Sequence, residues 1–113
     1  MNKSSCCIAV FPDYTAAAEA IDRLVASPMD KDLISLVGKD VQHGKVGLNG
    51  LSSLNDDLLQ LGVQEATLHC YQCMIHGGSF LVVVSGNYEQ VENACEHLEK
   101  NTQADVALHL NAP

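Results

Sequence analysis

Two periods of apolar and polar residues alternate along the chain, and each change of period predicts a new element. Residues 7–11, 33–37 and 80–84 carry apolar side chains at nearly every position, which is typical of buried strands. Residues 106–110 alternate apolar and polar side chains, as a half-buried strand does. The pattern therefore predicts four strands, separated by segments with helical spacing.

Four segments carry the start or stop signals of helices. Asp13 precedes apolar residues at the i, i+3, i+4, i+7 spacing, and Asn55 is expected to cap a short helix. Residues 65–76 form a second helical segment that ends at a glycine pair. Asn87 precedes the last helix, with Gln90 three residues on as in a capping box.

The strand–helix–strand pattern occurs twice, because residues 13–24 align with residues 87–98. Such a duplication predicts an α+β fold, a ferredoxin-like split βαβ sandwich in the order β-α-β-α-α-β-α-β. We expect a four-stranded antiparallel sheet, the repeat helices on one face and an inserted helical pair. Cys95 takes the place of Ile21 in the repeat, so Cys95 is expected to be buried. The predicted core consists of apolar positions on the strands and repeat helices: Ile8, Val10, Ile21, Leu24, Leu36, Leu81, Val83, Ala94, Cys95, Leu98 and Leu108.

The length of 113 residues fits a single domain, residues 1–113. Residues 1–6 are expected to form an N-terminal tail. Residues 41–53 contain three glycines and no sustained periodicity, which predicts a flexible connection.

A homodimer is expected from the apolar strands, which need cover on both faces of the sheet. The repeat helices cover one face, and the inserted helical pair looks too small for the other, so a second subunit would supply the missing surface. The alternative is a monomer in which residues 56–76 fold back and complete the cover.

The charge pattern bears on partners and compartment. The formal net charge is −8, from 14 acidic and 6 basic residues, and the basic residues never cluster. Nucleic acid and anionic membranes are bound mainly through basic patches, so neither is expected as a partner. No apolar run is long enough for a membrane span or a signal peptide, which predicts a cytoplasmic protein.

Thiols and imidazoles gather at His69, Cys70, Cys73 and His76, and these four side chains are the candidate metal site. Both ligand types suit zinc or copper, and helical spacing places them along one drifting stripe. Against a metal site, a C-x-x-C within a helix lacks the turn that lets both sulfurs reach one ion, and no second half of a site follows. Against a redox pair, the thiols are not at a helix N-terminus, where the dipole would lower their pKa.

Neither the other cysteines nor any known enzyme motif points to a catalytic site. Five cysteines are an odd number, and in a reducing compartment they are expected to be thiols. Cys6 and Cys7 are adjacent in the first strand, so one is expected in the core and one exposed. His109 faces away from the apolar stripe of the last strand and is not expected to be catalytic. The chain has no G-x-G-x-x-G, G-x-x-x-x-G-K-[ST], H-E-x-x-H or G-x-S-x-G motif, so no enzyme is predicted.

Several short stretches are similar to one bacterial family. They are Ile-Ala-Val-Phe-Pro-Asp at residues 8–13, Leu-Ile-Ser-Leu-Val-Gly-Lys-Asp at 33–40, Leu-Gly-Val at 61–63 with Glu65, Tyr71 and Gly78, and Phe-Leu-Val-Val-Val at 80–84. Together they resemble the general stress proteins, also called heat-induced stress proteins.

The resemblance has two departures. Members of that family often carry a long Gly/Ala-rich insertion resembling a membrane-associated hairpin, whereas only the compact segment 42–53 stands here. Cys70, Cys73 and His76 stand where the family usually has charged residues, which implies that they face solvent. The family offers no catalytic residues to carry over.

The expected function is that of a non-enzymatic stress-associated or regulatory module, without a cofactor, that acts by self-association or by binding an unidentified protein partner. The alternative is a small metal- or redox-responsive binding protein that uses His69, Cys70, Cys73 and His76 to hold zinc or copper.

Overall fold

The computed structural model describes residues 4–27, 29–48, 51–100 and 104–111. Within these residues, one antiparallel sheet has the strand order β3-β2-β4-β1-β5. The strands are β1 (Ser5–Phe11), β2 (Ile34–Val37), β3 (Gln42–His43), β4 (Phe80–Gly86) and β5 (Asp105–His109). The α-helices are α1 (Tyr14–Ala26), α2 (Leu51–Gln60), α3 (Glu65–His76) and α4 (Tyr88–Glu99), and one 3₁₀ turn (Lys31–Leu33) leads into β2.

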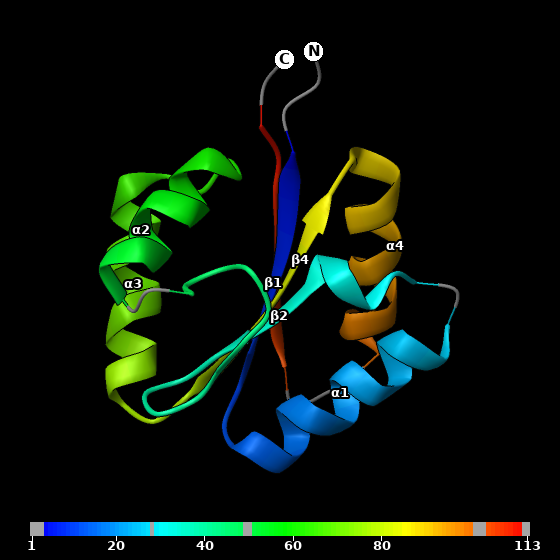
Figure 1. Cartoon of the computed structure of the whole chain (residues 1–113), viewed down its shortest axis with the longest axis horizontal. Coiled ribbons are helices and arrows are strands. Elements are labelled where there is room, and N and C mark those ends of the chain that lie inside the picture. Colours follow the sequence, from blue (N-terminus) through cyan, green and yellow to red (C-terminus); the bar gives the residue numbers. More distant parts are fainter. Residues whose placement is uncertain (1–3, 28, 49–50, 101–103, 112–113) are drawn as a thin grey trace.

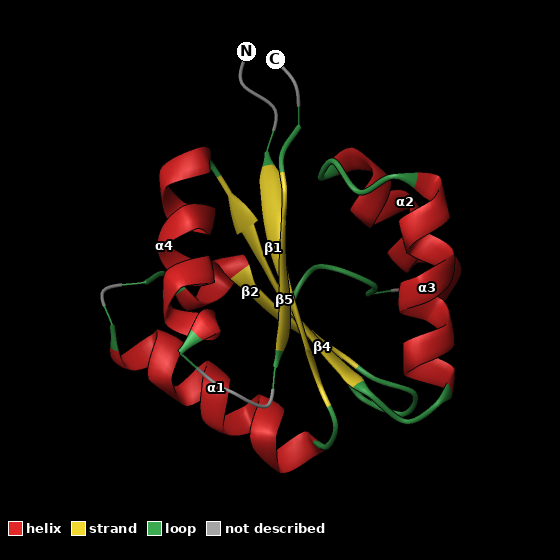
Figure 2. Ribbon diagram, turned by 180° about the vertical axis from the view of Figure 1, so that it is seen from behind, coloured by secondary structure: helices red, strands yellow, loops and turns green. Residues whose placement is uncertain are grey.

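The sheet lies between two layers of helices. Figure 1 shows α1 and α4 on one side of the strands and α2 and α3 on the other. The view from behind in Figure 2 shows the same three layers. Each layer of helices has its own hydrophobic core against the sheet.

The caps of the two repeat helices confirm the predicted starts. The Asp13 carboxylate accepts a hydrogen bond from the backbone N–H of Ala16 at 2.8 Å. Asn87 and Gln90 form the expected capping box, in which each side chain accepts from the other residue's backbone N–H. These bonds satisfy amide groups that a helix start leaves without a partner, so the local sequence fixes where α1 and α4 begin.

The inner strand β1, which lies between β4 and β5, is buried on both faces. Cys6, Cys7, Ile8 and Ala9 are fully buried, because Cys7 and Ala9 face the core under α1 and α4, while Cys6 and Ile8 face the core under α2 and α3. The expectation that one of the two adjacent thiols would be exposed is therefore wrong. The strand also begins at Ser5, so Ser5 and Cys6 belong to the sheet rather than to a tail over residues 1–6.

The second sheet face does not depend on another subunit for its cover. Leu54 and Leu58 from α2 and Ile75 from α3 are fully buried against Leu81 and Val83 of β4. The helical pair expected to be too small thus covers this face alone, which removes the reason given above for a homodimer. The homodimer itself stays a prediction.

The α+β class and the order of the predicted elements are confirmed, with one correction to the sheet. It has five strands and not four, because Gln42 and His43 pair with Val37 and Leu36 as a short edge strand. This strand lies inside the expected flexible connection, residues 41–53. Isolated pairs of residues carry no period, so the hydrophobic pattern could not reveal it.

Two further predictions concern helices and core. Helix α3 has the predicted bounds, whereas α2 already begins at Leu51, so Asn55 lies inside that helix and does not cap it. Cys95 is buried as the repeat predicted. Most of the predicted core is buried, but Val10, Ile21 and Leu108 are only partly buried.

None of the helices in the described part of the chain is long and apolar enough to cross a membrane.

Candidate functional site

The predicted Cys/His cluster lies on the outer side of α3. His69, Cys70, Cys73 and His76 are all exposed, as the resemblance implied for the last three. The helix brings one pair together, because Cys73 Sγ lies 3.7 Å from His69 Nε2, one turn away. Among the residues that the structure describes, which include all four of these, no group of three His, Cys, Asp or Glu side chains is placed to hold a metal ion.

The other three cysteines are buried thiols. Burial raises the pKa of Cys6 to about 12. The pKa of Cys7 is raised by burial first and then by its neighbour Cys95, and burial also raises the pKa of Cys95. A thiol reacts as its thiolate, so these groups are held in the unreactive form at neutral pH.

A hydrogen bond between Tyr71 and His109 joins α3 to the edge strand β5. The Tyr71 hydroxyl lies 2.7 Å from His109 Nε2, and the two rings meet edge to face with centroids 5.8 Å apart. Burial raises the pKa of Tyr71 to about 12 and lowers the pKa of His109, so both groups stay neutral near pH 7. The alternation along β5 places His109 on the α2/α3 face, but only the folded chain shows its partner.

Polar contacts of Asn111, just after β5, also join this end of the sheet to α2. Asn111 donates its backbone N–H to Ser5 Oγ at 3.0 Å and its side-chain amide to the carbonyl oxygens of Ser4 and Gln60. The turn at Gly62 is so close that a Cβ there would lie 2.9 Å from the Asn111 backbone nitrogen. These contacts read as structural ties between α2 and the sheet.

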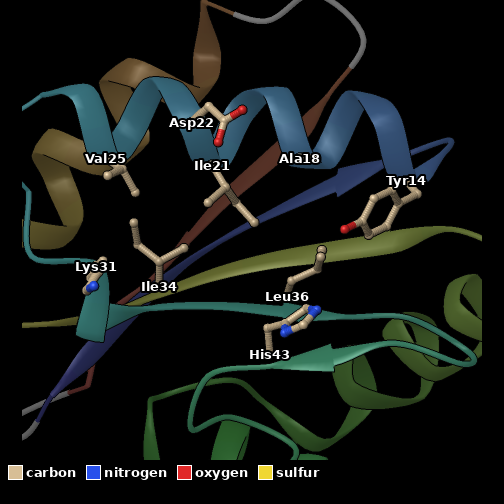
Figure 3. A pocket seen from close by; sticks show the side chains of 9 residues that line it. All are labelled: Tyr14, Ala18, Ile21, Asp22, Val25, Lys31, Ile34, Leu36 and His43. Carbon is tan, nitrogen blue, oxygen red and sulfur yellow. The ribbon is translucent and has the colours of Figure 1, made fainter.

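An apolar groove opens on the other side of the sheet, between α1 and the edge formed by β2 and β3. Ile34 and Leu36 of β2 form its floor, and Ala18, Ile21 and Val25 of α1 form its wall (Figure 3). The cavity has a volume of about 240 Å³. Helix α1 packs mainly on α4, β1 and β4, and the cavity lies where α1 passes β2 (Figure 3). We call this cavity the α1 groove.

Polar side chains mark the ends of the α1 groove. Lys31 stands at the end near Val25, and Tyr14 and His43 stand toward the other end (Figure 3). Asp22 of α1 borders the cavity as well (Figure 3). The groove therefore combines an apolar centre with one acidic and one basic side chain on its rim.

Tyr14 is held in place although it is 46% exposed. Its ring meets Phe80 edge to face, with centroids 5.9 Å apart and an interplanar angle of 77°. Phe80 in turn lies directly over Gly38, where an added Cβ would be 2.9 Å from the Phe80 ring. Because residue 38 is a glycine, the Phe80 ring has room to lie there, and Phe80 in turn packs against Tyr14.

His43 is placed by the hydrogen bonds of β3 and of the turn that follows. It pairs with Leu36, so both side chains lie on the groove face of the sheet. The turn packs tightly on β2, because Gly44 has a φ of +98° and an added Cβ would lie 2.5 Å from Ser35 Oγ. Ser35 Oγ itself accepts the backbone N–H of Val46 at 3.2 Å. The segment expected to be flexible is fastened here to a buried strand.

A larger hollow of about 360 Å³ lies between α2 and α3. Its lining includes Asp56, Glu65 and His69, all exposed, and it has fewer apolar contacts than the α1 groove. An open polar hollow of this kind is readily filled by water, so the α1 groove is the better candidate for binding.

Comparisons of the chain with protein-family models, with curated proteins and with solved structures find no match.

The α1 groove is the feature that sequence reasoning missed. Ile21 is predicted as a core residue, and residue 43 lies within the segment predicted to be a flexible connection. A signal was present in Val25, an apolar residue outside the stripe of α1 that is 46% exposed in the structure. Whether such a residue borders a cavity depends on the strands that pack beneath the helix. The pattern did not predict β3, which brings His43 into the lining.

Proposed function

We propose that the protein is a non-enzymatic binding module and that it binds an apolar group in the α1 groove. The observation that carries this proposal is the groove itself, a cavity of about 240 Å³ between Ile34 and Leu36 of β2 and the side chains of α1 (Figure 3). Ligand sites in proteins are concave and mostly apolar, with a few polar groups at fixed places, and the groove has this composition.

The state of the thiols supports the non-enzymatic part of the proposal. Cys6, Cys7 and Cys95 are buried with raised pKa values, so none of them is an activated nucleophile. The exposed pair Cys70 and Cys73 lies on the far side of the sheet from the groove. The alternative of a metal- or redox-responsive protein is supported by a single contact, that of His69 with Cys73.

Two finer proposals concern the fold family and the biological role. The order β2-β4-β1-β5 within the sheet supports a ferredoxin-like sandwich to which β3 has been added. A role associated with stress rests on the resemblance to general stress proteins alone.

Self-association is the second mode of action that we propose. The expected homodimer no longer follows from an uncovered sheet face, but the edge strands β3 and β5 remain open to pairing with another chain. Sedimentation at micromolar concentration tests it. A single species near 12.1 kDa would contradict the homodimer and leave the groove proposal intact.

The groove is tested with a small uncharged apolar probe, 1-hexanol, followed by amide chemical shifts in two-dimensional NMR spectra. We expect saturable shifts confined to residues of α1, β2 and β3, with a dissociation constant on the order of millimolar, as befits a ligand of so few atoms.

The matched variants are Ala18→Phe, which fills the groove, and Ala66→Phe, which places the same ring on the exposed side of α3. Ala18→Phe should abolish the shifts and Ala66→Phe should preserve them. Shifts that are scattered over the whole chain, or that survive Ala18→Phe, would refute the groove as the binding site.

A further inference from the structure

We propose that β5 is the surface through which two copies of this chain pair, strand to strand, about a two-fold axis at Ala107. This inference rests on the homodimer proposed above as the second mode of action, and it names the surface and the register. It follows from the open edge of β5, from the directions of its backbone groups and from the order of its side chains.

The edge strand β5 lacks the features that usually keep edges from pairing. Its residues, Asp-Val-Ala-Leu-His, include no lysine, proline or glycine. Its register with β1 runs without a bulge from the pair Cys6–His109 to the pair Val10–Asp105. In Figure 2, β5 lies between α4 and α3, and no helix of the described residues crosses in front of it. The edge strand at the other end of the sheet, β3, has only 2 residues and offers less backbone for pairing.

The backbone N–H and C=O groups of Val106 and Leu108 are directed to the open edge. Just beyond β5, Asn111 donates its backbone N–H toward β1, to Ser5 Oγ at 3.0 Å. Backbone groups alternate in direction along an extended strand, so those of the odd-numbered residues of β5 point toward β1. The even-numbered residues Val106 and Leu108 therefore present their N–H and C=O groups to another strand.

The apolar side chains of β5 match each other when two copies pair antiparallel about Ala107. In this register, Val106 of one copy lies opposite Leu108 of the other, and these two residues exchange both N–H···O bonds. Both side chains are only partly buried, on the side of the sheet that α1 and α4 cover. The second copy covers the part that stays exposed, apolar side chain against apolar side chain.

The polar side chains of β5 match in the same register. Asp105 of one copy lies opposite His109 of the other, on the side of the sheet that α2 and α3 cover. Asp105 is exposed, and it carries the acidic group of the strand. The His109 ring contacts the Tyr71 hydroxyl through Nε2, and when this hydroxyl donates, Nδ1 carries the proton that the Asp105 carboxylate can accept. An acid thus faces a hydrogen-bond donor at both ends of the paired strands.

Neighbouring registers match less well. An axis at Val106 would set Asp105 opposite Ala107, which offers the carboxylate no side-chain donor. An axis at Leu108 would set Asp105 opposite Asn111, whose side-chain amide already donates to two carbonyl oxygens of its own chain. The order of the side chains therefore selects the axis at Ala107.

Cross-linking tests the register, because a residue on the two-fold axis faces its own copy. The Cα atoms of such a pair are about 4.5 Å apart, within the range that a disulfide spans. Ala107→Cys, in a chain that also carries Cys70→Ser and Cys73→Ser, should give a covalent dimer on mild oxidation, seen by non-reducing electrophoresis. Asp105→Cys in the same chain should not, because the two copies of residue 105 would lie about 14 Å apart along the strands.

A matched pair of charge variants tests the polar contact. Asp105→Ala and Asp40→Ala remove the same charge from exposed positions, and residue 40 lies between β2 and β3 at the opposite edge. In sedimentation over a range of concentrations, Asp105→Ala should raise the dissociation constant of the dimer about fivefold, since two symmetric contacts are lost together. Asp40→Ala should leave it unchanged. Equal effects of the two variants would overturn the placement of Asp105 in the interface.

The other failures are distinct. A dimer that Ala107→Cys does not cross-link, or one that Asp105→Cys does, would overturn this inference and leave the homodimer standing. So would cross-linking by His43→Cys, which would place the contact at β3. A single species near 12.1 kDa would overturn both the homodimer and this inference and leave the α1 groove proposal intact.

Discussion

The two faces of the sheet are built from the same strands and are both buried, but they are packed differently. On the α2/α3 face, Leu54, Leu58 and Ile75 are fully buried, and the bond between Tyr71 and His109 fastens the layer to β5. On the α1/α4 face, Ile34 and Leu36 are buried too, but a cavity of about 240 Å³ lies between them and α1. A filled core favours stability, whereas a cavity bordered by apolar side chains offers a place for a ligand.

The difference follows from how each layer meets the sheet. The α2/α3 layer contacts the turn that follows β3. There the Asp57 carboxylate of α2 accepts the backbone N–H of Gly47 at 2.9 Å. Among the described residues, no hydrogen bond joins α1 to β3, and Ile21 of α1 points toward the floor of the groove (Figure 3). The inserted segment is thus tied to the β3 turn, whereas a cavity lies between the first repeat helix and β2.

The largest expected effect distinguishes the two faces by truncation. Leu58→Ala on the α2/α3 face should lower the free energy of unfolding by about 2–5 kcal/mol, because it leaves a cavity in a filled core. Ile21→Ala on the α1/α4 face should lower it by about 1 kcal/mol, since the side chain is only partly buried beside an existing cavity. Urea unfolding measures both. Equal losses would show that the two faces are packed alike.

The second prediction tests how firmly β3 is fastened. Gly44→Ala should lower the free energy of unfolding by about 2–3 kcal/mol, because a positive φ strains any side chain and its Cβ would also meet Ser35 Oγ. Gly78→Ala is the matched control, because Gly78 has the same φ of +98° but nothing within 4 Å of an added Cβ. It should lose only about 1 kcal/mol from the backbone. Similar losses in both variants would show that the turn after β3 shifts to accept a side chain at little cost in free energy.

The third prediction concerns the Tyr71–His109 bond. A double-mutant cycle with Tyr71→Phe and His109→Phe should give a coupling energy of about 1 kcal/mol in urea unfolding, as for a typical buried hydrogen bond. Tyr71→Phe alone should shift the pH dependence of His109, measured by its ring NMR signals. No coupling would show that the two rings merely lie side by side.

The same pair predicts a pH dependence. The pKa of His109 is lowered in the fold, so the unfolded chain binds the proton more readily and stability falls as pH drops below about 6.5. The pKa of Tyr71 is raised from 10.0 to about 12, so its contribution is complete below pH 10 and is lost as pH rises toward 12. His109→Phe should reduce the acid loss, and Tyr71→Phe should reduce the alkaline loss. Unchanged pH profiles would contradict the assignment.

The smallest expected effect is at the exposed cluster of α3. The double variant Cys70→Ser/Cys73→Ser should change the free energy of unfolding by no more than about 0.5 kcal/mol, because both side chains are exposed. Metal analysis of untagged protein should find zinc and copper well below one per chain. Stoichiometric metal that is lost in this variant would favour the metal-responsive alternative.

Local signals in the sequence predicted much of the fold. The Asn87–Gln90 capping box and the glycines after α3 act within a few residues, so they could be read directly and were confirmed. The repeat predicted the burial of Cys95, because equivalent helices pack on equivalent strands. These features depend on neighbours along the chain or on internal symmetry.

The rest depends on contacts between distant segments. The pairing of His43 with Leu36 creates β3, and the pairing of Tyr71 with His109 creates the tie to β5, yet neither leaves a periodic trace. The burial of both Cys6 and Cys7 could not be predicted without knowing that α2 and α3 cover the second face. The α1 groove was missed for the same reason, since it forms between α1, β2 and His43 of β3, which only the fold brings together.

The position of β1 between β4 and β5 has a consequence for how the chain folds. It is the first strand in the sequence, but its neighbours in the sheet are β4 and β5, from the last part of the chain. During synthesis β1 stays without its neighbouring strands until most of the chain has left the ribosome. Sheets closed by such distant pairings fold slowly, because long loops lose entropy before the contacts form. Helix α1, whose cap lies within its own first turn, can form while β1 is still unpaired.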